Sequence, residues 1–157
     1  MTFMELQDAL VEEVESICSE IVTTDTSGAR VTGITGYKHQ LPILMADEDD
    51  TSKYYPFFIV RLAGGETKDD EDWWHVSTDI IFGLHDDSLS DGHEHVLIAC
   101  QRVLDRFAAE PLLAKKFRAE QDMTWMLGED DTYPFYFGAV GIKFSVPKIG
   151  RGNPIFV

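Results

Sequence analysis

The most constraining feature of this sequence is the stretch Asp72–Asp87, which reads DWWHVSTDIIFGLHDD. Because successive side chains of a β-strand point to opposite sides, the stretch predicts a long strand with one apolar face. The apolar face carries Trp74, Val76, Thr78, Ile80, Phe82 and Leu84. The other face is mixed, so it suits either water or another subunit. It carries Trp73, His75, Ser77, Asp79, Ile81, Gly83 and His85.

Two amphipathic helices are predicted, one before this strand and one after it. Apolar residues recur at helical spacing in Thr2–Ile21, where Thr2 followed by Glu5 forms a capping box. The second helix is expected to be capped in the same way by Asp91 with Glu94, and to end at Pro111. Its predicted buried stripe consists of Val96, Cys100, Val103 and Phe107.

Further strands are expected around the long one. Tyr54–Leu62 has strand composition, and Ala63–Asp72, a Gly-Gly turn with an acidic run, would join it to the long strand in an antiparallel hairpin. Met123–Leu127 and Pro134–Pro147 alternate in the same manner. Arg30–Met45 predicts only a ragged strand or an extended arm, because glycines and a proline interrupt it.

These elements predict an α+β fold. We expect a mostly antiparallel sheet of about four to five strands with two amphipathic helices packed on one face. Leu112–Phe117 suggests a short helical turn between the second helix and the later strands. The chain has 157 residues, which suits a single domain over 1–147. Residues 148–157 then form a tail that is either frayed or docked, in the latter case as an arm between subunits.

The charge of the chain excludes some classes of partner. Its 28 acidic and 13 basic residues give a formal net charge of -15. Phosphate contacts need Lys and Arg, so we expect no specific binding of nucleic acid, and an anionic membrane surface would repel the chain. No run approaches the roughly 20 apolar residues of a membrane span. Met1–Asp8 does not look like a signal peptide, so a cytoplasmic origin is expected.

The sequence contains no recognisable catalytic or metal-binding set, so we expect no enzyme activity, no cofactor and no metal. His75 and His85 share a strand face but would lie about 33 Å apart. Cys18 and Cys100 fall on the apolar stripes of the helices. Two small buried hydrophobes in a reducing compartment are the expected interpretation, since a disulfide would need the two to be close in space.

Three acidic runs allow several interpretations. They are Asp47–Asp50, Asp69–Asp72 and Glu129–Asp131. They could be solvated loop tips or calcium ligands, although the spacing of an EF-hand loop is absent. In an assembly they could instead line an axial channel and keep DNA from adhering to its wall. The residues proposed for such a channel are Asp69, Asp70, Glu71 and Asp72.

Several segments, in this order, carry a resemblance to a known group of proteins. They are Gln40–Pro42, Tyr54–Leu62, Ile80–Gly83, His95–Phe107, Met123–Trp125 and Tyr133–Gly138. The pattern resembles that of tail terminator proteins, a family of phage and prophage structural proteins. The resemblance implies a small α/β domain that closes into a hexameric ring on the tail tube, beside the head-side connector.

The function implied by this resemblance is non-enzymatic. The chain would be a tail terminator or neck-type ring subunit that joins the tail tube to the head connector and lets DNA pass. It would assemble in the bacterial host cytoplasm and reside in the virion. The alternatives are another minor tail or tail-completion protein, or a small cytoplasmic binding module that uses the exposed sheet face. The expected subunit contacts are Trp73, His75, Ser77, Asp79, Ile81, Arg151, Ile155 and Phe156.

Overall fold

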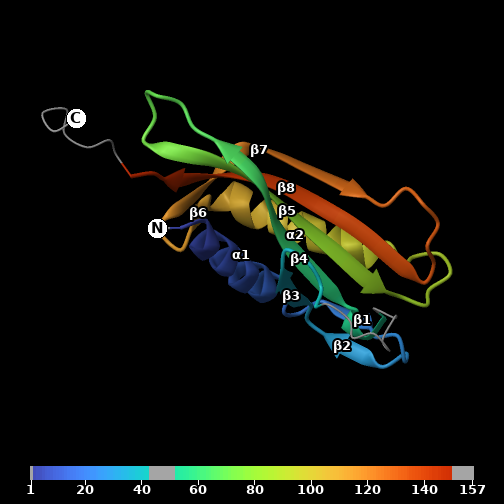
Figure 1. The fold of residues 1–157 in the computed structure, drawn as a ribbon. Coiled ribbons are helices and arrows are strands. Elements are labelled where there is room, and N and C mark those ends of the chain that lie inside the picture. The colour runs from blue at the N-terminus through green and yellow to red at the C-terminus, as the bar shows by residue number, and fades with distance from the viewer. Residues whose placement is uncertain (1, 43–51, 150–157) are drawn as a thin grey trace, which may run out of the picture.

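The computed structural model describes residues 2–42 and 52–149, which form two helices and one large sheet (Figure 1). The helices are α1 (Phe3–Ile17) and α2 (Glu94–Ala109), and η1 (Ser52–Tyr54) is a short 3-10 turn. The strands are β1 (Val22–Thr24), β2 (Arg30–Thr32), β3 (Thr35–Lys38), β4 (Phe57–Glu66), β5 (Trp73–His85), β6 (Leu112–Leu113), β7 (Phe117–Leu127) and β8 (Phe135–Pro147).

Strand β5 is the centre of the sheet. It pairs with β8 along its whole length, from Trp73 opposite Pro147 to His85 opposite Phe135. On its other side it pairs with β4, and at its end with β1. Beyond β8 lie β7 and then β6, so most of the sheet is antiparallel. The exception is β3, which runs parallel to β4.

The apolar face of β5 forms the centre of the core, as its alternation predicts. Val76, Ile80 and Phe82 are buried under α1 and α2, which both pack on this one face of the sheet. The polar member of the row, Thr78, is also buried, and its hydroxyl donates a 2.8 Å hydrogen bond to the carbonyl of Ile142. This bond satisfies the hydroxyl, so the row can be buried without an unpaired polar group.

The predicted cap of α1 is confirmed for the Thr2 hydroxyl, while the Glu5 carboxylate lies 3.4 Å from the Lys116 ammonium group, and the predicted side-chain cap of α2 is wrong. The Thr2 hydroxyl accepts a 3.0 Å hydrogen bond from the Glu5 amide at the start of α1. At α2 the N-cap residue is His93, and no side chain makes a capping bond there. The Glu94 amide donates instead to the backbone carbonyl of Asp91. A backbone hydrogen bond therefore takes the place of the predicted side-chain cap. At its other end, α2 stops before Pro111, as expected.

The prediction of about four to five strands is wrong, because the described residues form a sheet of eight. The additional strands are β1 and β6, and the single ragged strand expected in Arg30–Met45 consists of two short strands, β2 and β3. Each has only two to four residues, which is too short to show alternation. The stretch Leu112–Phe117, expected as a helical turn, contains β6 and a tight turn into β7. Ala114 and Lys115 make this turn with positive φ angles of 53° and 59°.

The two cysteines are buried and free, as the helical pattern predicts. Burial raises the pKa of the Cys18 thiol to about 12 and that of Cys100 to about 11. Neither is a reactive thiolate, because the deprotonated form is the nucleophile. Of the helices in residues 2–42 and 52–149, neither is long and apolar enough to span a bilayer.

Gly138 in β8 offers a test of how closely α2 packs on the sheet. A Cβ at this position would lie 2.4 Å from a methyl carbon of Val96. We therefore expect Gly138→Ala to lower the free energy of unfolding by about 1–3 kcal/mol, as measured by chemical denaturation. Gly128→Ala is the matched control, since its nearest heavy atom would lie at 3.5 Å, and it should change stability by less than about 0.5 kcal/mol. Equal effects of both substitutions would contradict the close packing.

Candidate interaction surface

The face of the sheet opposite the helices is here called the open face. No helix of the described ranges 2–42 and 52–149 packs on it. Residues opposite one another in neighbouring strands share a face, so the registers of β4, β5, β8 and β7 define its members. They include Phe57, Ile59, Arg61, Trp73, His75, Ser77, Asp79, Ile81, Gly83, His85, Phe135, Phe137, Ala139, Gly141, Lys143, Ser145, Thr124 and Met126.

The structure places the five predicted contact residues of β5 together on this face. Trp73, at the end of the strand, is 41% exposed. The other four are half-buried in the single chain: His75, Ser77, Asp79 and Ile81. Their arrangement on one side agrees with the alternation, while their contact with another subunit stays a prediction. The tail residues Arg151, Ile155 and Phe156 and the run Asp47–Asp50 lie outside the described residues.

His75 links two parts of the chain that are distant in sequence. Its Nε2 lies 2.6 Å from a carboxylate oxygen of Glu71, in the turn between β4 and β5. Its Nδ1 lies 2.7 Å from a carboxylate oxygen of Glu120, in β7. Carboxylates only accept hydrogen bonds, so the two bonds need a proton on each ring nitrogen. His75 is therefore best accommodated as an imidazolium between two carboxylates.

The electrostatics of this cluster follow from the two bonds. The hydrogen bond to Glu120, followed by that to Glu71, raises the pKa of His75 above its ordinary value, against the smaller opposing effect of desolvation. The charged form thus holds the β4–β5 turn against β7, across the intervening strand β8. We call Glu71, His75 and Glu120 the His75 bridge.

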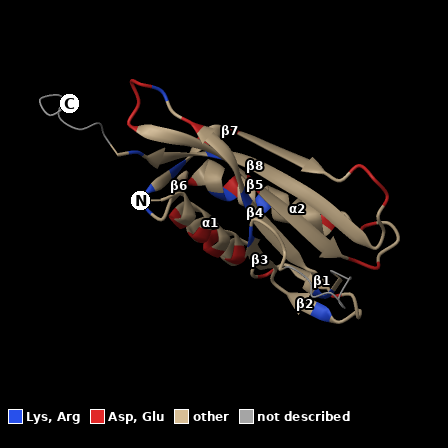
Figure 2. Cartoon of the chain, in the orientation of Figure 1, with Lys and Arg blue, Asp and Glu red and all other residues tan. Residues whose placement is uncertain are grey.

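The acidic turn Asp69–Asp72 forms the tip of the β4–β5 hairpin (Figure 2). Asp69, Asp70 and Asp72 are exposed, whereas Glu71 is half-buried because it takes part in the His75 bridge. Lys148, just after β8, closes this end of the sheet. Its amide donates to the carbonyl of Asp72, and its ammonium group donates to the Thr67 hydroxyl.

The opposite end of the open face is aromatic. The ring of Tyr55 lies 4.9 Å from that of Phe57 and 4.7 Å from that of Phe135, measured between centroids. Phe57 covers Gly83 of β5, where a Cβ would come within 2.4 Å of its ring. Phe57 is buried although it lies outside the main core cluster. The open face therefore has an apolar half and a charged half.

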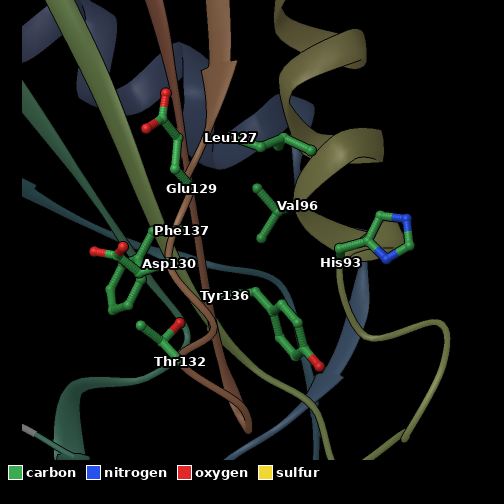
Figure 3. Close-up of a pocket in the computed structure, with 9 residues that line it drawn as sticks. His93, Val96, Leu127, Glu129, Asp130, Thr132, Tyr136 and Phe137 are labelled. Carbon is green, nitrogen blue, oxygen red and sulfur yellow. The ribbon is translucent and has the colours of Figure 1, made fainter.

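The outer edge of the sheet ends in a small pocket (Figure 3). Within the described residues, β6 covers only the start of β7, and no strand pairs with the outer side of Met123–Leu127. Trp125 and Met126 in this segment are 54% and 67% exposed. Where β7 ends, a pocket of about 160 Å³ is lined by Val96, Leu127, Glu129 and Asp130, among others.

The histidines of the open face are engaged in specific contacts. In the parts of the chain that the structure describes, no three His, Cys, Asp or Glu side chains gather as metal ligands. Both ring nitrogens of His75 face carboxylates, and His85 is buried with Nδ1 2.9 Å from the Thr24 hydroxyl. The surface thus has the charges and apolar groups that suit binding of another protein.

Sequence reasoning found His75 but missed its partner Glu120. The two residues lie on strands separated by β8, and the register of β7 shifts between Ala119 and Met123. Glu120 falls in this irregular segment, so alternation along β7 does not indicate its direction. The only available signal was the presence of acidic residues near the start of a strand.

The comparisons with known proteins leave the family open. No protein-family model matches the sequence, and no curated protein matches it at a significant level. The resemblance to tail terminators therefore stays a prediction.

The His75 bridge predicts a specific pH dependence of stability. Below the ordinary histidine pKa near 6.5 the imidazole is charged in both folded and unfolded chains, so the bridge contributes fully. As the pH rises through the raised pKa of the folded state, the proton and this contribution are lost. His75→Gln should therefore reduce the free energy of unfolding at pH 6 and have a smaller effect at pH 9, as measured by urea denaturation.

The exposed His93 supplies the control for this measurement. His93→Gln should produce no such change in its effect between pH 6 and pH 9. If the effect of His75→Gln were the same at both pH values, the charged bridge would be refuted.

Proposed function

We propose that the chain is a non-enzymatic virion assembly protein, a tail terminator or neck-type ring subunit of a phage or prophage. The observation that carries the proposal is the open face. The 13-residue strand β5 has both helices on one side, and the described residues provide no helix for the other. An antiparallel sheet can leave one face to water, but the mixed apolar and charged groups of this face also suit contact with a second protein surface.

The form of the sheet supports assembly through contacts between different surfaces. The sheet is open, with β2, β3 and the end of β4 along one edge and β6 and β7 along the other. Two unlike surfaces on one subunit permit head-to-tail contacts, which close into a ring when the rotation between copies is right. In the proposed role, one side of the ring binds the tail tube and the other binds the head connector.

The charge distribution supports a conduit for DNA. Exposed carboxylates gather at both ends of the long strands, in the turn with Asp69, Asp70 and Asp72 and in the connection with Glu129, Asp130 and Asp131 (Figure 2). Phosphates are repelled by such groups, so a channel lined by either set would let DNA pass without retaining it. With a net charge of -15, the chain has few cations for holding a phosphate backbone.

The proposal predicts an oligomer in solution. At an ionic strength near 0.15 M, where the Debye length of about 8 Å screens repulsion between acidic copies, we expect a ring of about six subunits. Native mass spectrometry and light scattering over a range of concentrations measure the subunit number. A monomer at every concentration would contradict the ring and favour a small binding module.

Trp73 tests whether the open face is part of the subunit contact. Because Trp73 is 41% exposed, Trp73→Asp should leave the folded structure intact and abolish the oligomer. Circular dichroism reports the fold, and light scattering reports the assembly. Leu89→Asp is the control, since Leu89 is 90% exposed on the connection between β5 and α2 and should tolerate the charge. An intact oligomer with Trp73→Asp would exclude the open face at this position.

A further inference from the structure

The outer edge of β7 has the properties of a binding site for an extended segment. The outward backbone groups of Met123–Leu127 meet no strand within the described residues. The segment reads MTWML and carries no charge, although charges are a common protection of exposed strand edges. An added strand would satisfy these backbone groups, and its side chains would cover the exposed Trp125.

The side chains next to this edge define the chemistry of the occupant. Trp125 lies opposite Val140, a core residue, so its ring is on the helix side of the sheet, where it is 54% exposed. Glu129 and Asp130 follow the end of β7 and line the pocket there (Figure 3). The edge therefore suits an extended segment with apolar residues beside Trp125 and a cation about four residues away, beside the carboxylates.

The C-terminal segment of the chain has this pattern. Arg151 is followed four residues later by Ile155, Phe156 and Val157. In an antiparallel register with Ile155 opposite Trp125, Val157 falls opposite Met123. The same register places Arg151 opposite Glu129. One register thus matches apolar with apolar and basic with acidic residues, and Pro154 is acceptable because the added strand is itself an edge.

The length of the chain requires the segment to come from another copy. Trp125 lies beside Val140 of β8, whereas Ile149 lies past the other end of β8, where Lys148 still bonds to Asp72 (Figure 1). The nine residues from Val140 to Ile149 span about 30 Å in a strand. The six residues from Ile149 to Ile155 reach at most about 22 Å. A segment folding back along its own β8 would also run parallel to β7.

We propose that residues 150–157 of a second copy add to the outer edge of β7 as an antiparallel strand. The contact is head-to-tail, because the segment leaves one end of a subunit and binds near the opposite end of the next. It rests on the proposed ring function and identifies one of the contacts that would close the ring.

Disulfide trapping in the full-length chain tests the contact. Trp125→Cys and Ile155→Cys are prepared as separate variants, mixed in equal amounts and oxidised with oxidised glutathione. Opposite residues of paired antiparallel strands have Cα atoms about 4.5–5.5 Å apart, which lies within the range of about 4.4–6.8 Å that a disulfide spans. We expect a cross-linked heterodimer on a non-reducing gel. The native Cys18 and Cys100 do not interfere, because both are buried.

The matched control replaces the edge position with a distant exposed one. Leu89→Cys, at a residue that is 90% exposed, should give little cross-linking with Ile155→Cys under the same conditions. A Glu129→Cys variant mixed with Arg151→Cys tests the register and should also cross-link. Absence of the Trp125–Ile155 product, or equal yield with Leu89→Cys, would overturn the proposed contact.

The oligomer measurement separates the failure of this contact from failure of the ring function. If the full-length chain forms a ring and Trp125→Cys does not cross-link with Ile155→Cys, the segment contact is wrong and the ring proposal stands. If the two variants cross-link while the chain forms only open chains or dimers, the contact stands and the closed ring is wrong. If the chain forms no ring and the two variants do not cross-link, the ring proposal and the segment contact are both wrong.

Discussion

The rest of the structure depends on the burial of one face of β5. Ile80 and Phe82 are inaccessible to solvent because β4 and β8 fix the strand on both sides and the helices cover its apolar row. Because side chains alternate along a strand, burial of this row places the other side chains of β5 on the open face. A shift of one residue in register would instead place Asp79 and His75 in the core. The charged and aromatic halves of the open face are thus a consequence of core packing, and the candidate interaction surface needs no separate structural support.

The long elements could be predicted from the sequence, and the short ones could not. The alternation in β5 and β8 extends over many residues, and so do the apolar stripes of α1 and α2. Each pattern is therefore repeated often enough to identify the element. Strands β1 and β6 have two or three residues and form because neighbouring strands provide backbone partners. The wrong prediction of the α2 cap has a similar origin. The backbone carbonyl of Asp91, and not its side chain, accepts the hydrogen bond from the Glu94 amide.

The candidate surface was predictable only where it follows strand periodicity. The face that contains Trp73 and His75 is set by alternation, and the structure confirms that grouping. The pairing of His75 with Glu120 depends on the irregular register of β7, and the exposure of Trp125 depends on which strand ends the sheet. Both are properties of strand order, and strand order is not encoded in the pattern of any single segment.

The pairing of β5 with β8 has a consequence for the order of folding. Its partners lie roughly 50 to 75 residues apart in the chain, whereas β4 and β5 are joined by a short turn, so the entropy of loop closure favours the hairpin first. Strand β8 is also synthesised last of the strands in the described residues, and the terminal segment follows it in the sequence. In the contact that we propose, the sheet of each copy would therefore be complete before that copy joins the next.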